Sequence, residues 1–237
     1  ILITSGKIDA DDAEVVQGIS GYSAGVASSG VSYEIEDNVA ELISATDSVL
    51  TYGNINVTAT NSANAIDGAA LNAFTADIDF DVADTAINLA DQVDGTNGAI
   101  GSLDDAANIE VLSGQAVDVQ DATAIQGISG YTGAGDLDIE DSAAALISAG
   151  DPILNQAGID HIKASDSSVL ANIGADLNGF TAAIEFDVSD TADNIATYVN
   201  QLTEADDVFV VSGDVSISEA QSIQSLGGYN ASGSTYE

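Results

Sequence analysis

The 237-residue sequence has no cysteine, methionine, tryptophan or arginine, and only one histidine and one proline. Without cysteine, disulfide bonds, thiolate metal sites and cysteine nucleophiles are excluded. Lys7 and Lys163 are the only lysines, against 39 Asp and Glu, and the formal net charge is −37. Nucleic acids and anionic membranes bind clustered basic residues, so neither is expected as a partner. No apolar run approaches the roughly 18 residues of a membrane span, so membrane insertion is not expected.

Apolar residues nevertheless make up 45 % of the sequence. Disordered acidic tails lack the apolar surface that offsets the entropy lost on folding, so this chain is predicted to fold. Aromatic residues make up 5 %, which fits thin layers of small side chains. Pro152 falls between the repeated elements and leaves them unbroken.

Two motifs recur along the chain, with a longer period of about 105 residues and a shorter one of about 50. The first motif aligns without gaps at Lys7–Tyr22, Ala116–Tyr131 and Asp214–Tyr229. The second occurs at Tyr33–Leu42, Phe80–Leu89, Leu137–Leu146 and Phe186–Ile195. We therefore predict two long repeats of two half-units each, at residues 1–109 and 110–207, and the truncated start of a third at 208–237.

The last residues, Ser234–Glu237, match Val31–Glu34 and would begin another strand. Half a strand leaves backbone groups unpaired. We therefore expect the chain to be a piece of a longer repeat array.

The first motif predicts a strand followed by a helix. Val117 and Val119 have the period of two typical of a half-buried strand, and Ala122, Ile125 and Ile128 then recur every three residues, as in a short helix. The glycine that follows in two copies of the motif is expected to be a left-handed C-cap residue. These glycines are Gly130 and Gly228.

The second motif follows the same plan. Ile184, Phe186 and Val188 alternate with polar residues and predict a strand. Asp190 is expected to be the N-cap of the helix that follows it. The equivalent residues in the other copies are Asp37, Asp84 and Asp141.

Consecutive strand–helix pairs imply parallel strands. We predict an α/β fold, a tandem-repeat solenoid of short parallel strands and short helices, because one repeat has too little core to fold alone. The alternative is a string of small β-rich domains of about 105 residues each.

Aligning the second motif gives a column of acidic residues on the outward side of its strands. This column contains Glu34, Asp81, Asp138, Asp187 and Glu237. The neighbouring outward column is mixed and contains Asp79, Asp136 and Glu185 beside Ser32 and Thr235. If equivalent strands stack, the carboxylates form ladders whose repulsion needs cations. Oxygen ligands favour Ca²⁺, so these acids are predicted calcium ligands. The alternative is a solvated acidic face.

Other candidate sites are weaker. The segments Asp91–Gly98 and Thr203–Val208 are either calcium loops or acidic turns. His161, the only histidine, is expected to be a surface residue. No phosphate-binding glycine loop with lysine is present. The repeated acids belong to the repeat rather than interrupt it, so the chain is predicted not to be an enzyme.

The phrases "SDTADNIA" and "VSISEAQSIQSLGGY" resemble repeats of very large bacterial surface and secreted proteins, including surface-layer-like, adhesin-like and matrix proteins of cyanobacteria and proteobacteria. The resemblance implies an extracellular location and association with calcium. We therefore expect an extracellular structural protein that forms a surface layer, filament or matrix and self-associates head to tail through strand addition. The alternative is an adhesin stalk that presents a separate ligand-binding domain.

Overall fold

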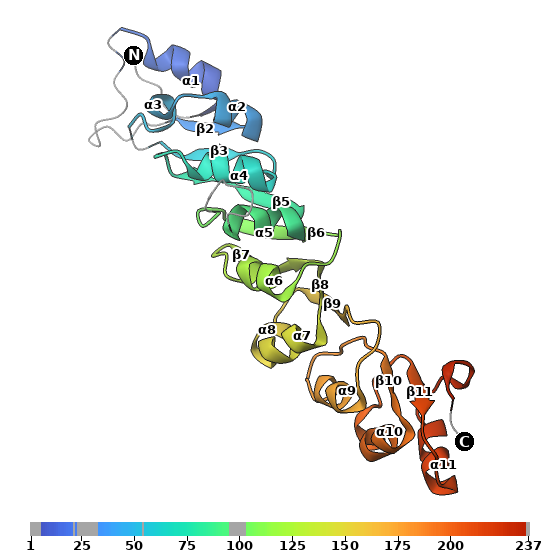
Figure 1. Cartoon of the computed structure of the whole chain (residues 1–237). Helices are drawn as coiled ribbons and strands as arrows, with labels where there is room; N and C mark the ends of the chain where they lie inside the picture. Colours follow the sequence, from blue (N-terminus) through green and yellow to red (C-terminus); the bar gives the residue numbers. More distant parts are fainter. Residues whose placement is uncertain (1–5, 21, 23–32, 54, 95–102, 236–237) are drawn as a thin grey trace. The chain divides into compact units, whose positions relative to one another are not determined.

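The computed structural model describes residues 6–20, 22, 33–53, 55–94 and 103–235. It confirms the mixed α/β class, with short helices alternating with short strands (Figure 1). The chain forms two compact units. Unit 1 contains residues 1–115 and 124–135, and unit 2 contains residues 116–123 and 136–237. The division into sequence repeats at residues 109 and 207 stays a prediction.

Within each unit, consecutive strands lie side by side. In unit 1, β1, β2, β3 and β4 form one sheet in that order, and β5, β6 and β7 form another; in unit 2, β8 pairs with β9 and β10 with β11. Every strand pair in the described part of the chain is parallel, as predicted. The strands are β1 Lys7–Ile8, β2 Glu34–Asp37, β3 Val57–Ala59, β4 Ile78–Asp79, β5 Asp81–Thr85, β6 Asn108–Leu112, β7 Tyr131–Gly135, β8 Leu137–Asp141, β9 Ile159–Ala164, β10 Val188–Thr191 and β11 Val208–Ser212.

Short helices provide the crossovers that parallel strands need. They are α1 Ala10–Gln17, α2 Val39–Ser44, α3 Asp47–Leu50, α4 Ala65–Asn72, α5 Ala86–Asp94, α6 Val119–Gln126, α7 Ala143–Ala149, α8 Asp151–Leu154, α9 Ala171–Leu177, α10 Ala192–Tyr198 and α11 Ile217–Gln224, with 3₁₀ turns at Val199–Gln201 and Ala231–Gly233. We call one strand together with the helix that follows it a strand–helix segment.

The core lies between the strands and the helices. Ile184, Phe186 and Val188 are all buried, as their alternation predicted, and Glu185 between them is exposed. The predicted strand is shorter than expected, because β10 begins at Val188 and Ile184 and Phe186 lie before it. The prediction for the first motif was partly wrong. Val119 is the first residue of α6 rather than part of a strand, although Val117 does make a parallel bridge to Ile139.

The motif aspartates cap a different helix from the one predicted. The N-cap of α10 is Thr191, whose hydroxyl accepts from the backbone N–H of Asn194. Asp190 precedes it, and its Oδ2 accepts from the backbone N–H of Ala171, the first residue of the preceding helix α9 (3.0 Å). The aspartate therefore joins two strand–helix segments.

This cross-segment cap recurs in six of the described helices. In each, a side-chain oxygen from the next strand–helix segment accepts from the first helical N–H, which has no partner within the helix itself. The acceptors are Asp37 for α1, Asn61 for α2, Asp84 for α4, Asp141 for α6, Asp166 for α7 and Asp190 for α9. The motif alignment included four of these acceptors and missed Asn61 and Asp166.

The glycines at the ends of α6 and α11 have another role than the one predicted. Gly130 and Gly228 are not among the glycines of the described chain with positive φ. A Cβ on Gly130 would lie 2.5 Å from the carbonyl oxygen of Ala106, and one on Gly228 would lie 2.4 Å from that of Ala205. The absence of a side chain lets neighbouring backbones approach closely.

A second repeated contact joins an aspartate to a threonine of a later segment. The backbone N–H and hydroxyl of Thr75 donate to the carboxylate of Asp47, and those of Thr181 donate in the same way to Asp151. These bonds, led by the hydroxyl of Thr75, lower the pKa of Asp47 below its ordinary value of 3.8. A lowered folded-state pKa stabilises the folded chain above pH 3.8, and this contribution is lost as the pH falls through the lowered pKa.

We therefore expect Thr75→Val to destabilise the protein at neutral pH. The destabilisation should disappear in acid, where Asp47 is protonated. Urea denaturation of the variant and the wild type between about pH 7 and about pH 2 measures the difference directly. Thr46→Val is the control, because the Thr46 hydroxyl bonds to the hydroxyl of Ser48, which does not ionise in this range, so its effect should stay constant with pH. A Thr75→Val effect that does not change with pH would contradict the role of Asp47.

Candidate cation-binding surface

The described residues of the two predicted acidic columns all lie outside the core. Glu34, Asp79, Asp81, Asp136 and Glu185 are exposed, and Asp138 and Asp187 are half-buried. Glu237 lies outside the described residues. Each acid is next to a buried residue of its strand, such as Ile35 after Glu34 and Val82 after Asp81. Because neighbouring residues of a strand point to opposite faces, the acids point outward.

The predicted ladder of directly opposed carboxylates is wrong in the described sheets. The strand neighbour of Glu34 is Lys7, that of Asp81 is Asn108, and that of Asp138 is His161. The second column behaves in the same way, with Asp79 beside Thr58 and Glu185 beside Lys163. Within each unit, another strand, β3 in unit 1 and β9 in unit 2, lies between the copies of the second motif, and it brings a different residue to each position.

Lys7 lies on β1 of unit 1, and His161 and Lys163 lie on β9 of unit 2. Lys7 Nζ lies 2.9 Å from Glu36 Oε2, and this hydrogen bond raises the pKa of Lys7. Lys163 stands in register between Glu140 and Glu185. The few cations of the chain are therefore placed where strand pairing brings acids together, which reduces the repulsion between them.

One group of described residues brings three potential metal-ligand atoms together. The donor atoms of Asp138, Asp160 and His161 all lie within 4.8 Å of one another. His161 Nδ1 is 3.2 Å from Asp138 Oδ1 and 3.1 Å from Asp160 Oδ2. The hydrogen bond that the imidazole donates to Asp138 and the charge of Asp160 raise the pKa of His161. Asp138 was a predicted ligand, whereas Asp160 and His161 were not.

A second acidic group lies at the start of β10 and β11. The backbone N–H of Asp207 donates to Asp187 Oδ1, and Asn230 Nδ2 donates to Asp207 Oδ1. Burial, together with the charges of Glu185, Asp187 and Asp207, raises the pKa of Asp206. Burial and the neighbouring like charges thus both disfavour the charged form of Asp206, and a bound cation would relieve the part that is due to repulsion.

The structure gives less support to the two loops predicted as possible calcium sites. In Asp91–Gly98, residues 95–98 lie outside the described residues. In Thr203–Val208, Glu204 and Asp207 use their backbone N–H groups to bind Asn178 and Asp187. These bonds fix an acidic turn, and calcium binding by the turn stays a prediction.

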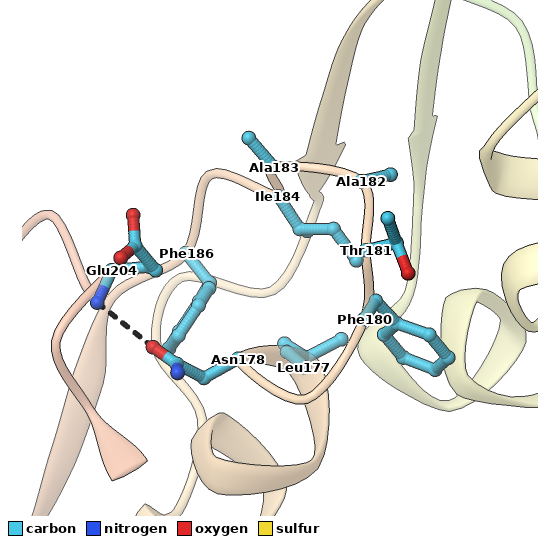
Figure 2. A pocket seen from close by; sticks show the side chains of 9 residues that line it. All are labelled: Leu177, Asn178, Phe180, Thr181, Ala182, Ala183, Ile184, Phe186 and Glu204. Atoms are coloured by element: carbon cyan, nitrogen blue, oxygen red, sulfur yellow. Dashed lines mark hydrogen bonds between the residues drawn. The ribbon is translucent and has the colours of Figure 1, made fainter. Parts of the chain in front are cut away.

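A hollow of about 240 Å³ in unit 2 has apolar side chains in its lining, but most of the surface that it exposes is polar (Figure 2). Leu177, Phe180, Ile184 and Phe186 contribute to it, and Glu204 is the only ionisable residue in its lining. The dashed line in Figure 2 is the bond from the Glu204 backbone N–H to Asn178 Oδ1, 2.8 Å long. The backbone N–H of Asp105 binds Asn72 in the same way in unit 1. The hollow is thus built from a repeated structural contact and presents no acid–base pair.

Comparison with protein families, with curated proteins and with solved structures found no match. The resemblance to bacterial surface repeats therefore stays a prediction. Among the described residues, no helix combines the length and the apolar character that crossing a bilayer requires.

Proposed function

We propose that this chain is an extracellular structural repeat protein of a surface layer, filament or matrix, built as a solenoid of stacked strand–helix segments. One observation supports the proposal most strongly. The residues that recur along the chain, such as Asp84 and Asp190 or Thr75 and Thr181, hold one strand–helix segment to the next. Repetition of such contacts is what an extensible scaffold requires, since each segment buries its core against its neighbours.

The second part of the proposal is that Ca²⁺ stabilises the acidic faces. The net charge of −37 opposes the compact state unless counterions neutralise it. The group formed by Glu185, Asp187, Asp206 and Asp207 is one place where acids lie close together, and their charges add to burial in raising the pKa of Asp206. Oxygen ligands without sulfur or a strict geometry suit Ca²⁺ better than other common cations.

We expect added calcium to raise the melting temperature relative to chelator. A cation that binds only the folded chain adds about 2.7 kcal/mol when its concentration is 100 times its Kd. Thermal melting with CaCl₂ and with KCl at the same ionic strength separates binding from screening. A shift no larger in CaCl₂ than in KCl would remove calcium from the proposal and leave the repeat architecture untouched.

The remaining part is head-to-tail self-association. Parallel strands with open edges can add strands from another molecule. A layer or filament subunit should grow in size with concentration, and it should fall apart in chelator if calcium bridges the copies. The alternative, an adhesin stalk, should stay monomeric at every concentration. Light scattering over a concentration series, with and without chelator, distinguishes the two.

A further inference from the structure

Strand β9 contains a bulge at the point where it meets β8. Leu137 pairs with Ile159, but the next residue, Asp138, pairs with His161, so Asp160 is the extra residue of β9. In a regular strand, Asp160 and His161 would point to opposite faces. A bulge redirects side chains. Here Asp160 Oδ2 and Asp138 Oδ1 both lie close to the same imidazole nitrogen.

The two long repeats differ at this point. Ile35 and Ile139 are equivalent in the second motif, and their strand partners are Val57 and Ile162. It follows that His161 corresponds to Asn56 and Asp160 to Ile55 of the first repeat. A residue that serves only the architecture should recur with it, as Asp84 and Asp190 do. Asp160 and His161 instead break the repeat, and together they add a nitrogen and an oxygen donor to the acid at 138.

We propose that Asp138, Asp160 and His161 form a binding site for a divalent transition metal of the zinc class, at the bulge between β8 and β9. The donors are one imidazole nitrogen and two carboxylate oxygens. Zinc bonds to such donors are about 2.0–2.2 Å long, so two of its ligands lie at most about 4.4 Å apart. The donor atoms here, all within 4.8 Å of one another, need only small side-chain movements to reach that spacing.

The donor set and its surroundings favour this class of metal over calcium. Imidazole is a preferred ligand of zinc, nickel and copper, whereas Ca²⁺ takes oxygen ligands. The side chains of His161 and Asp160 are 64 % and 59 % exposed, so an ion can enter and keep water in its remaining positions. Lys163 is also on β9, and its positive charge is offset by Glu140 and Glu185, with which it stands in register. The proposal is independent of the calcium proposal.

Isothermal titration calorimetry of the whole chain, prepared without a histidine tag, tests the site with ZnCl₂. We expect one zinc ion per chain above the weak binding shared by all the carboxylates. His161→Asn introduces the residue found at the equivalent position of the first repeat, and it should reduce the affinity at least about tenfold. Asp160→Asn should reduce the affinity similarly. Asp81→Asn is the matched control, since it removes one exposed strand carboxylate elsewhere and should leave zinc binding unchanged.

The single histidine permits a second readout that is free of folding effects. The imidazole C–H signals in a nuclear magnetic resonance spectrum come from His161 alone, and we expect them to shift as one equivalent of zinc is added. Excess CaCl₂ should not reverse that shift. Equal affinity in His161→Asn and wild type, imidazole signals unaffected by zinc, or full displacement of zinc by calcium would each overturn the proposal.

Discussion

Asp190→Ala is expected to lower the free energy of unfolding by about 2–4 kcal/mol, because hydrogen bonds to charged groups contribute about 1.5–3 kcal/mol each and are not fully additive. Asp190 is only 6 % exposed. Its Oδ2 accepts from the Ala171 N–H, and its Oδ1 accepts from the Thr191 N–H at 2.7 Å and from Asn194 Nδ2 at 2.8 Å. Alanine would leave all three donors without this acceptor.

Asp193→Ala is the matched control for this variant. Asp193 also lies at the start of α10, but its side chain is exposed, so its loss should cost only the roughly 0.3–1 kcal/mol of a helix-dipole interaction. Asp190→Asn should be almost as damaging as alanine, because both carboxylate oxygens accept N–H groups and an amide would turn an NH₂ toward one of them. Urea denaturation followed by circular dichroism measures all three variants.

The helices that are destabilised by the loss of Asp190 also show which helix it caps. If Asp190 joins segments, its loss should increase amide hydrogen exchange in α9 as well as in α10. Faster exchange confined to α10 would mean that the aspartate serves only the helix that follows it, which is the role that the sequence alone predicts.

The pattern of residues identified the capping aspartates but not the helix that they cap. An aspartate before a helical pattern is typical of an N-cap, and the first helical amide of another segment, 19 residues earlier in the case of Ala171, leaves no mark in the local sequence. Alternation did predict that Ile184, Phe186 and Val188 are buried, because period two follows from extended backbone geometry, but only Val188 lies in the strand β10.

The acidic columns show a related limit. Alignment compares equivalent residues, and equivalent strands need not be neighbours. Glu34 and Asp81 belong to successive copies of the second motif, yet Glu34 is on β2 of one sheet and Asp81 is on β5 of another. The register that sets Asp81 beside Asn108 depends on the lengths of the connections, and so does the bulge that sets Asp160 beside His161. Neither the strand register nor the bulge can be predicted from composition or periodicity.

The second large effect is expected from a glycine inside a helix. A Cβ on Gly174 of α9 would lie 2.9 Å from Val188 Cγ2, 3.0 Å from Leu202 Cδ2 and 3.1 Å from Phe186 Cε2. The equivalent Gly68 of α4 has the same kind of surroundings, with Val82 Cγ2 at 2.8 Å. A side chain at this position would therefore have to displace the buried side chains that pack against the helix.

Gly174→Val should therefore destabilise the protein by about 3 kcal/mol, the upper part of the range for overpacked cores. Gly174→Ala should cost less, because a smaller overlap is offset by the roughly 1 kcal/mol that alanine gains over glycine in a helix. Gly227→Val is the control, since a Cβ there meets nothing within 4 Å, and we expect it to be near neutral. Urea midpoints that fall in the order control, alanine, valine would support the close packing of α9.

An unchanged midpoint for Gly174→Val would show that α9 can move away from β10 at little cost. The cross-segment bond from Ala171 to Asp190 makes that outcome unexpected, because it fixes the start of the same helix one turn before Gly174. Gly174 and Asp190 thus both support the contact between α9 and β10. The aspartate anchors the end of the helix to the next strand, and the glycine allows the helix to approach that strand closely enough for the bond to form.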